Sequence, residues 1–143
     1  MKILDNGDVV FSNVKALYPK LNRTYHFSSE QSKSVPCDAL ADGAAYTIDF
    51  ELDKKTCIDF DKECNKVYKA AADADTKKKW KADPTYLPYK DNGEYFTGKA
   101  KLKGAYSGEA TRPPLQKDAE RNSLPANFEL TTGSKVNVWG KLF

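Results

Sequence analysis

The sequence predicts a mainly β fold in which one long helix is inserted between strands. Residues 45–53 (AYTIDFELD) alternate apolar and polar side chains with a period of two, which indicates a strand with one buried and one wet face. Residues 57–80 carry apolar side chains at helical spacing instead. Further strand-like segments precede and follow this helix. This order of elements is typical of a small OB-fold-like Greek-key barrel.

The length and the charge of the chain limit what it can be. Its 143 residues suit a single domain over residues 1–143, and a chain of this size buries roughly two thirds of its unfolded surface. The formal net charge of +3 permits a nucleic-acid partner without demanding one. The first ten residues lack the apolar segment of a secretory signal, and no apolar run approaches the roughly 20 residues of a membrane span. We therefore expect a protein that stays where it is made.

The N-terminal third is expected to hold one strand followed by a long loop. Residues 8–18 (DVVFSNVKALY) are rich in β-branched and aromatic side chains and predict a strand that ends at Pro19. Residues 20–43 are polar and rich in serine, which predicts a loop with a short strand at residues 23–27. A loop of this length is uncommon in a compact domain and would be functional or mobile.

The helix is expected to span residues 57–80. Thr56 is the predicted N-cap, with Asp59 three residues later. Three lysines, Lys77–Lys79, would lie in the last turn and complement the helix dipole, and Pro84 prevents a longer helix. The apolar stripe would consist of Phe60, Cys64, Val67, Tyr68 and Ala71.

The part of the chain after the helix contains further strands and one long loop. Asn92-Gly93 is a strong turn signal in front of a strand. The predicted segments are a loop at 86–92, a strand at 94–106, a proline-rich loop at 107–126, a short strand at 127–130 and a last strand at 134–143.

Two of these strands place lysines and an aromatic side chain on their outward faces. The outward residues are Tyr95, Thr97, Lys99, Lys101 and Lys103 in one strand and Lys135, Asn137, Trp139 and Lys141 in the other. The inward residues are Phe96, Gly98, Ala100 and Leu102, and Val136, Val138 and Leu142. Lysines neutralise phosphates, and an exposed ring stacks on an unpaired base of any sequence. The pattern therefore predicts a surface for single-stranded DNA.

Other interpretations of these residues remain open at this point. Lysines on a wet strand face also serve as solvating charges that protect edges from aggregation. Trp139 would pack under the helix or a long loop if it were a core residue. Tyr86, Tyr89 and Lys90 repeat the lysine-aromatic combination on a loop, where a turn that packs its own rings is the alternative. The predicted DNA-binding residues are Lys99, Lys101, Lys103, Tyr95, Lys135, Trp139, Lys141 and Tyr89.

Features of an enzyme or a metal protein are weak. The cysteines, Cys37, Cys57 and Cys64, form no CxxC pair, and His26 is the only histidine. We interpret the cysteines as small hydrophobic residues in a reducing compartment and expect no metal and no cofactor. The acidic residues Asp49, Glu51, Asp53, Asp59 and Asp61 could be imagined as a two-metal nuclease site, but they lack a basic or histidine partner. We expect a protein that is not an enzyme.

Residues 49–143 resemble the single-stranded-DNA-binding proteins of tailed bacteriophages, an OB-fold replication family. The matching pieces are residues 46–53 leading into the helix, residues 87–93 (LPYKDNG), residues 95–101 (YFTGKAK) and residues 133–138 (GSKVNV). The resemblance implies a non-catalytic protein that coats single strands in phage replication, recombination or repair, in the cytoplasm of a bacterial host. It also implies a basic groove, which matches Lys99, Lys101, Lys103, Lys135, Trp139 and Lys141.

The chain departs from this family at its C-terminal end. Such proteins usually continue into a further strand and an acidic tail that contacts replication proteins, whereas this sequence ends at Lys141-Leu142-Phe143. We therefore expect a truncated chain without the tail. Single-stranded DNA is the expected partner, and double-stranded DNA and a second copy in a homodimer remain open. The alternative function is a phage structural or protein-interaction domain, whose affinity would not fall steeply with salt as a DNA contact does.

Overall fold

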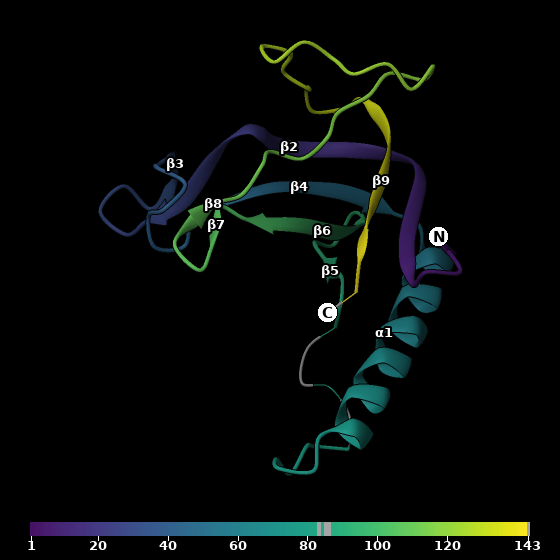
Figure 1. Cartoon of the computed structure of the whole chain (residues 1–143). Coiled ribbons are helices and arrows are strands. Elements are labelled where there is room, and N and C mark those ends of the chain that lie inside the picture. The colour runs from purple at the N-terminus through teal and green to yellow at the C-terminus, as the bar shows by residue number, and fades with distance from the viewer. Residues whose placement is uncertain (83, 85–86, 143) are drawn as a thin grey trace. The chain divides into compact units, whose positions relative to one another are not determined.

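The computed structural model describes residues 1–82, 84 and 87–142, so Tyr86 and Phe143 lie outside the described residues. The described residues form the helix and the antiparallel strands that are labelled in Figure 1. In chain order the elements are β1 (Lys2–Ile3), β2 (Asp8–Ser28), β3 (Lys33–Pro36), β4 (Ala45–Leu52), α1 (Lys54–Ala74), β5 (Lys90–Asp91), β6 (Phe96–Lys103), β7 (Ala105–Tyr106), β8 (Glu109–Ala110) and β9 (Lys135–Lys141).

The strands form one large sheet and one small hairpin. The large sheet has the order β1-β2-β4-β6-β5, and both β3 and β9 also pair with β2, while β7 pairs with β8. This architecture confirms the predicted mainly β, OB-like fold with one helix inserted after β4. The chain divides into two compact units: unit 1 comprises residues 1–15, 50–98 and 135–143, and unit 2 comprises residues 16–49 and 99–134.

Strand β2 is much longer than the sequence predicts. It continues for 21 residues through Pro19 to Ser28, so the predicted end at Pro19 and most of the predicted loop at 20–43 are wrong. The strand is irregular where the sequence suggested a stop. Its register with β9 shifts between Phe11 and Val14, and Tyr18 adopts a positive φ of 48°. Proline is tolerated beside such irregularities, because the backbone there does not need an unbroken ladder.

Strand β4 has the predicted alternation. Tyr46, Ile48, Phe50 and Leu52 are buried, while Asp49 and Glu51 on the opposite face are only half-buried. In unit 1 the Phe50 ring lies 4.9 Å from that of Phe11, and the Phe11 ring lies 5.0 Å from that of Phe60, measured between centroids. These three rings join β2, β4 and the first turns of α1 into one aromatic core.

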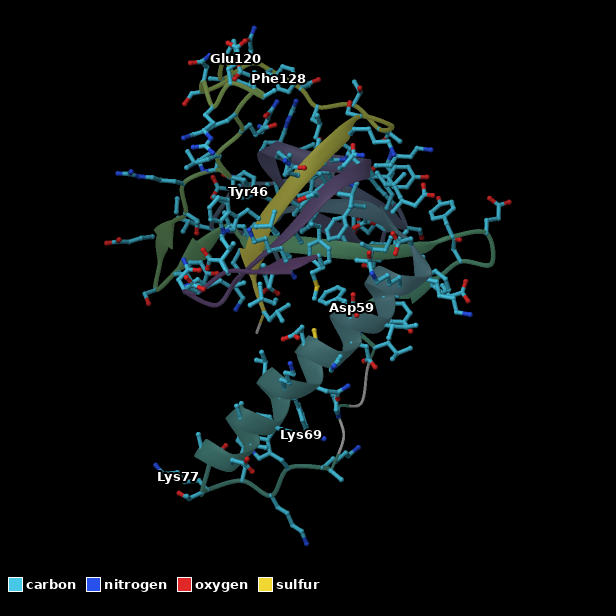
Figure 2. All side chains as sticks on the ribbon, turned by 90° about the vertical axis from the view of Figure 1, so that its right-hand side faces the viewer. Tyr46, Asp59, Lys69, Lys77, Glu120 and Phe128 are labelled. Atoms are coloured by element: carbon cyan, nitrogen blue, oxygen red, sulfur yellow. The ribbon has the colours of Figure 1, made fainter. Side chains whose placement is uncertain are left out.

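The helix begins and ends earlier than predicted. Its N-cap is Asp53, not Thr56, because the Asp53 carboxylate accepts a hydrogen bond of 2.7 Å from the Thr56 amide. It ends at Ala74, where the Asp75 carboxylate accepts from the amide of Lys77 at 2.9 Å. An aspartate that binds the backbone two residues later favours a turn over a continuing helix. Lys77 therefore lies beyond the helix (Figure 2), and the predicted basic last turn is wrong.

Only the first part of α1 buries its apolar stripe. Cys57 and Phe60 are buried, whereas Val67 is exposed. Farther along, the Tyr68 ring packs at 5.1 Å against Trp80 in the segment that follows the helix. Burial raises the pKa of the half-buried Cys64 thiol to about 11, in keeping with its interpretation as a small hydrophobic residue. Within the described residues, no helix has the length and the apolar character of a membrane span.

The segment after α1 agrees with the sequence at its turn and differs at residues 127–130. Asn92-Gly93 connects β5 to β6 in a hairpin, with Gly93 at a positive φ of 92°. The predicted strand at 127–130 is wrong, because these residues are irregular. The Phe128 carbonyl accepts a hydrogen bond from the side chain of Asn22, which replaces a strand partner.

Candidate nucleic-acid interface

Strand β9 presents the predicted outward residues to solvent. It pairs antiparallel with the first half of β2, so that Trp139 faces Val10 and Lys141 faces Asp8. The exposed residues of the β9 face are Lys135, Asn137, Trp139 and Lys141. The Trp139 side chain is 66% exposed, so the alternative that it packs under the helix or a loop is wrong.

The Trp139 ring is fixed at its edge by Asp8. Its indole Nε1 donates a hydrogen bond of 2.9 Å to Oδ2 of Asp8, and Lys141 Nζ lies 3.6 Å from Oδ1 of the same carboxylate. The hydrogen bond from Trp139 is the main cause that lowers the pKa of Asp8, and Asn6 and Lys141 add to it. An exposed ring with an anchored edge and an open face is suited to stacking on a base.

Asp8 was not among the predicted site residues. It lies at the start of the first predicted strand, to which no binding role was assigned, and its distance in sequence from Trp139 conceals the contact. The signal that could have identified Asp8 is its charge, which is opposite to that of Lys141. The two residues are direct cross-strand partners, but this pairing is apparent only when the register of β2 and β9 is known.

Tyr89 and Tyr95, also in unit 1, are less open than Trp139. The Tyr89 ring is half-buried and meets the Phe96 ring edge to face, with centroids 5.6 Å apart. This contact corresponds to the alternative of a segment that packs its own aromatic rings. Tyr95 is half-buried in the β5–β6 hairpin, where its amide donates to the Asn92 side chain at 2.9 Å. A role for either ring in DNA binding stays a prediction.

Unit 2 contains the three predicted lysines of β6. Lys99, Lys101 and Lys103 are exposed, while Ala100 and Leu102 between them are half-buried, as the alternation predicts. Lys99 Nζ lies 3.5 Å from Oδ1 of Asp49, so its charge is partly neutralised. Lys103 Nζ lies over a ring of the next hairpin. The three lysines thus differ in how readily each can meet a phosphate.

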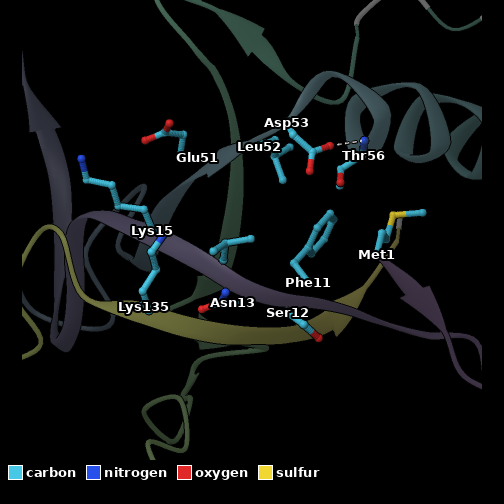
Figure 3. Close-up of a pocket in the computed structure, with 11 residues that line it drawn as sticks. Met1, Phe11, Ser12, Asn13, Lys15, Glu51, Leu52, Asp53, Thr56 and Lys135 are labelled. Carbon is cyan, nitrogen blue, oxygen red and sulfur yellow. Dashed lines mark hydrogen bonds between the residues drawn. The ribbon is translucent and has the colours of Figure 1, made fainter.

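A cavity of about 250 Å³ lies beside the register shift of β2 in unit 1 (Figure 3). Lys15 and Lys135, which are direct cross-strand partners, line it together with Glu51, Asp53 and Thr56. Figure 3 shows Glu51 and the two lysines at one end and Asp53 with Thr56 at the other. Lys15 was not predicted, and it adds a cation next to the β9 face.

Two of the acidic residues considered for a nuclease site have other contacts. Asp49 pairs with Lys99, and Asp53 caps α1, where the backbone amide of Thr56 lowers its pKa. Within the described part of the chain, no three metal-binding side chains are brought together. The carboxylates of Asp49 and Asp53 are therefore accounted for by local structure.

Comparison with known proteins identifies a shared fold. No family model and no curated protein matches the chain. Three solved structures of the single-stranded DNA-binding protein from bacteriophage Enc34 do match it. The C-terminal truncation is 17% identical with a TM-score of 0.63 and covers 97% of this chain and 75% of that chain. The complex with single-stranded DNA is 19% identical with a TM-score of 0.63, covering 96% and 75%.

The third structure, of the same phage protein, is 20% identical with a TM-score of 0.60, and the match covers 96% of this chain and 69% of that chain. At this level of identity the comparison shows the fold. It confirms, at the level of fold, the resemblance to phage single-stranded-DNA-binding proteins that the sequence predicts.

Proposed function

We propose that the protein binds single-stranded DNA without sequence preference, through the exposed lysines of β9 and β6 and through stacking aromatic rings, foremost Trp139 on β9. The observation that carries the proposal is the exposed Trp139 ring, which is 66% exposed, anchored by Asp8 and flanked by lysines on its own strand. A tryptophan in a folded chain normally buries most of its surface. Its exposure beside cations is accounted for by a base that stacks on it and phosphates that bind the lysines.

The comparison supports the same ligand. One of the matching structures is a phage protein in complex with single-stranded DNA. By analogy, this protein would coat single strands during phage DNA replication, recombination or repair, in the cytoplasm of a bacterial host. This role is non-catalytic, because it requires affinity and not turnover.

Fluorescence anisotropy of a labelled oligo-dT, titrated at two salt concentrations, tests the proposal. We expect salt-sensitive binding that Trp139→Ala weakens by about 1–3 kcal/mol, the typical contribution of one stacking ring. Trp139→Phe should restore much of the loss, because phenylalanine keeps a ring. Lys101→Glu should weaken binding more at low salt than at high salt.

The chain offers matched controls for both substitutions. Trp80 is the other tryptophan, and its indole also donates to an aspartate, Asp75, at 3.0 Å. Trp80→Ala should leave affinity unchanged. Lys69→Glu, on α1, makes the same charge change as Lys101→Glu and should have a smaller effect (Figure 2). Absence of binding by the parent at low salt would refute the proposal and direct the search to protein partners.

A further inference from the structure

Unit 2 presents an aromatic ring that the strand alternation did not predict. Tyr106 lies at the end of β7, and its side chain is 53% exposed. Lys103 Nζ lies 6.0 Å from the centroid of the Tyr106 ring, within the range of a cation–π contact. Continued alternation from Lys99 to Lys103 would have turned residue 106 to the inward face. Instead, the Tyr106 ring is exposed beside Lys103, so the alternation must be interrupted between these two residues.

The interruption lies at Gly104, where the chain bends between β6 and β7. Gly104 is buried, and a Cβ added there would lie 2.6 Å from the Ala39 carbonyl oxygen. Its amide donates to the Ala44 carbonyl at 2.8 Å, and its carbonyl accepts from the Thr111 amide at 2.8 Å. The close approach needs a residue without a side chain. The bend at Gly104 shifts the phase of the alternation, so that Tyr106 becomes exposed.

The β7–β8 hairpin holds the ring in place. Ala105 pairs with Ala110 and Tyr106 with Glu109, and the two turn residues, Ser107 and Gly108, have positive φ values of 50° and 80°. Two central residues with positive φ are typical of the tight hairpin turn that matches strand twist. Glu109 is the direct cross-strand partner of Tyr106, and its negative charge disfavours a phosphate there. A neutral base stacked on the Tyr106 ring is compatible with this negative charge, whereas a phosphate would be repelled by it.

We propose that Tyr106 is a base-stacking residue for single-stranded DNA, with Lys101 and Lys103 binding phosphates beside it. This inference rests on the proposed function and deepens it. Trp139 with the β9 lysines forms one ring-and-lysine set in unit 1, and Tyr106 with the β6 lysines forms a second set in unit 2. In this proposal each unit contacts the single-stranded DNA through an aromatic ring of its own.

Substitution of Tyr106 tests the stacking role directly. In the oligo-dT titration, Tyr106→Ala should weaken binding roughly 5- to 150-fold, the range expected for the loss of one stacked base. Tyr106→Phe should stay within about twofold of the parent, because stacking uses the ring and not the hydroxyl. The salt dependence should not change in either variant, because no charge is removed. Phe27→Ala is the control, since this ring is also in unit 2 and is 68% exposed.

Photo-crosslinking to a bromodeoxyuridine oligonucleotide gives an independent readout that no folding defect can imitate. Trypsin cleaves after Lys103 and Lys117, and Tyr106 is the only aromatic residue in the resulting peptide, residues 104–117. The peptide of residues 136–141 likewise contains only Trp139 as an aromatic residue. We expect DNA adducts on both peptides.

The outcomes separate this inference from the proposed function. Adducts on residues 136–141 alone, with Tyr106→Ala binding like the parent, would overturn the role of Tyr106 and leave DNA binding intact. An equal loss from Phe27→Ala would also overturn it, because any exposed ring would then contribute. Failure of the parent to bind would refute the proposed function itself.

Discussion

The indole Nε1 of Trp139 donates a hydrogen bond of 2.9 Å to Oδ2 of Asp8, a residue 131 positions earlier in the chain. The same carboxylate has Lys141 Nζ 3.6 Å from its other oxygen. Asp8 therefore orients the ring proposed to stack and, at the same time, partly neutralises a lysine proposed to bind phosphate. These two effects act on DNA binding in opposite directions, and substitutions can separate them.

Asp8→Asn should tighten DNA binding. Asparagine keeps an oxygen that can accept from the indole, but it removes the negative charge that competes with phosphate for Lys141. We expect an affinity gain of roughly two- to fivefold at low salt, the scale of an exposed ion pair, and a smaller gain at high salt. Asp8→Ala should bind less tightly than Asp8→Asn, because the ring loses its anchor. Equal affinities of the two variants in the anisotropy titration would show that the hydrogen bond does not matter.

The stability contributed by Asp8 should depend on pH. Its folded-state pKa lies below the ordinary value of 3.8, chiefly because of the indole hydrogen bond, so the carboxylate stabilises the folded protein when ionised. This contribution is present above about pH 4 and is lost as the pH falls through the lower folded-state pKa. Urea unfolding of the parent and Asp8→Asn at pH 7 and at acid pH checks the prediction. The difference between their unfolding free energies should shrink in acid, and a constant difference would contradict it.

Lys101→Ala should weaken DNA binding more than Lys99→Ala. Lys99 lies 3.5 Å from Asp49 and must give up this contact to bind phosphate, so it contributes less. Asp49→Asn should remove the difference, so that Lys99→Ala in that background costs as much affinity as Lys101→Ala. A double-mutant cycle measures this coupling. A coupling free energy of zero between Lys99 and Asp49 would show that the ion pair does not affect DNA binding.

Gly98→Ala should destabilise the protein by about 1–3 kcal/mol, the usual cost of overpacking a core. A Cβ at Gly98 would lie 2.7 Å from the Phe50 ring and 3.1 Å from Leu52. Gly140 is the control, because no heavy atom lies within 4 Å of a Cβ built there. Gly140→Ala should therefore leave the urea midpoint unchanged or raise it. Similar midpoints for the two variants would mean that the core adapts around Gly98.

Alternation predicts these strand faces well, because one side chain points inward and the next outward wherever a sheet has one wet face. This rule placed the β4 core and the exposure of Lys101 and Trp139 correctly. It failed at Tyr106, because the buried Gly104 shifts the phase of the pattern. A glycine in a strand signals such a shift only when the atom it approaches, here the Ala39 carbonyl, is known.

Contacts between distant segments account for most of the other errors. Pro19 predicts the end of a strand locally, but the tertiary partners of β2 continue past it. Asp8 was missed because its role depends on a register that only the fold determines. The helix ends were misplaced because Asp53 and Thr56 are both good N-caps, and Asp75 stops the helix before its lysines.

The pairing of β9 with the first half of β2 also has a consequence for the newborn chain. Residues 8–15 leave the ribosome early, but their partner strand at 135–141 is made more than a hundred residues later. Contacts between such remote segments close late, because a long loop must first be ordered. The Trp139 surface therefore forms only after β9 has been synthesised and has left the ribosome, so a nascent chain that has not yet reached β9 cannot use it to capture DNA.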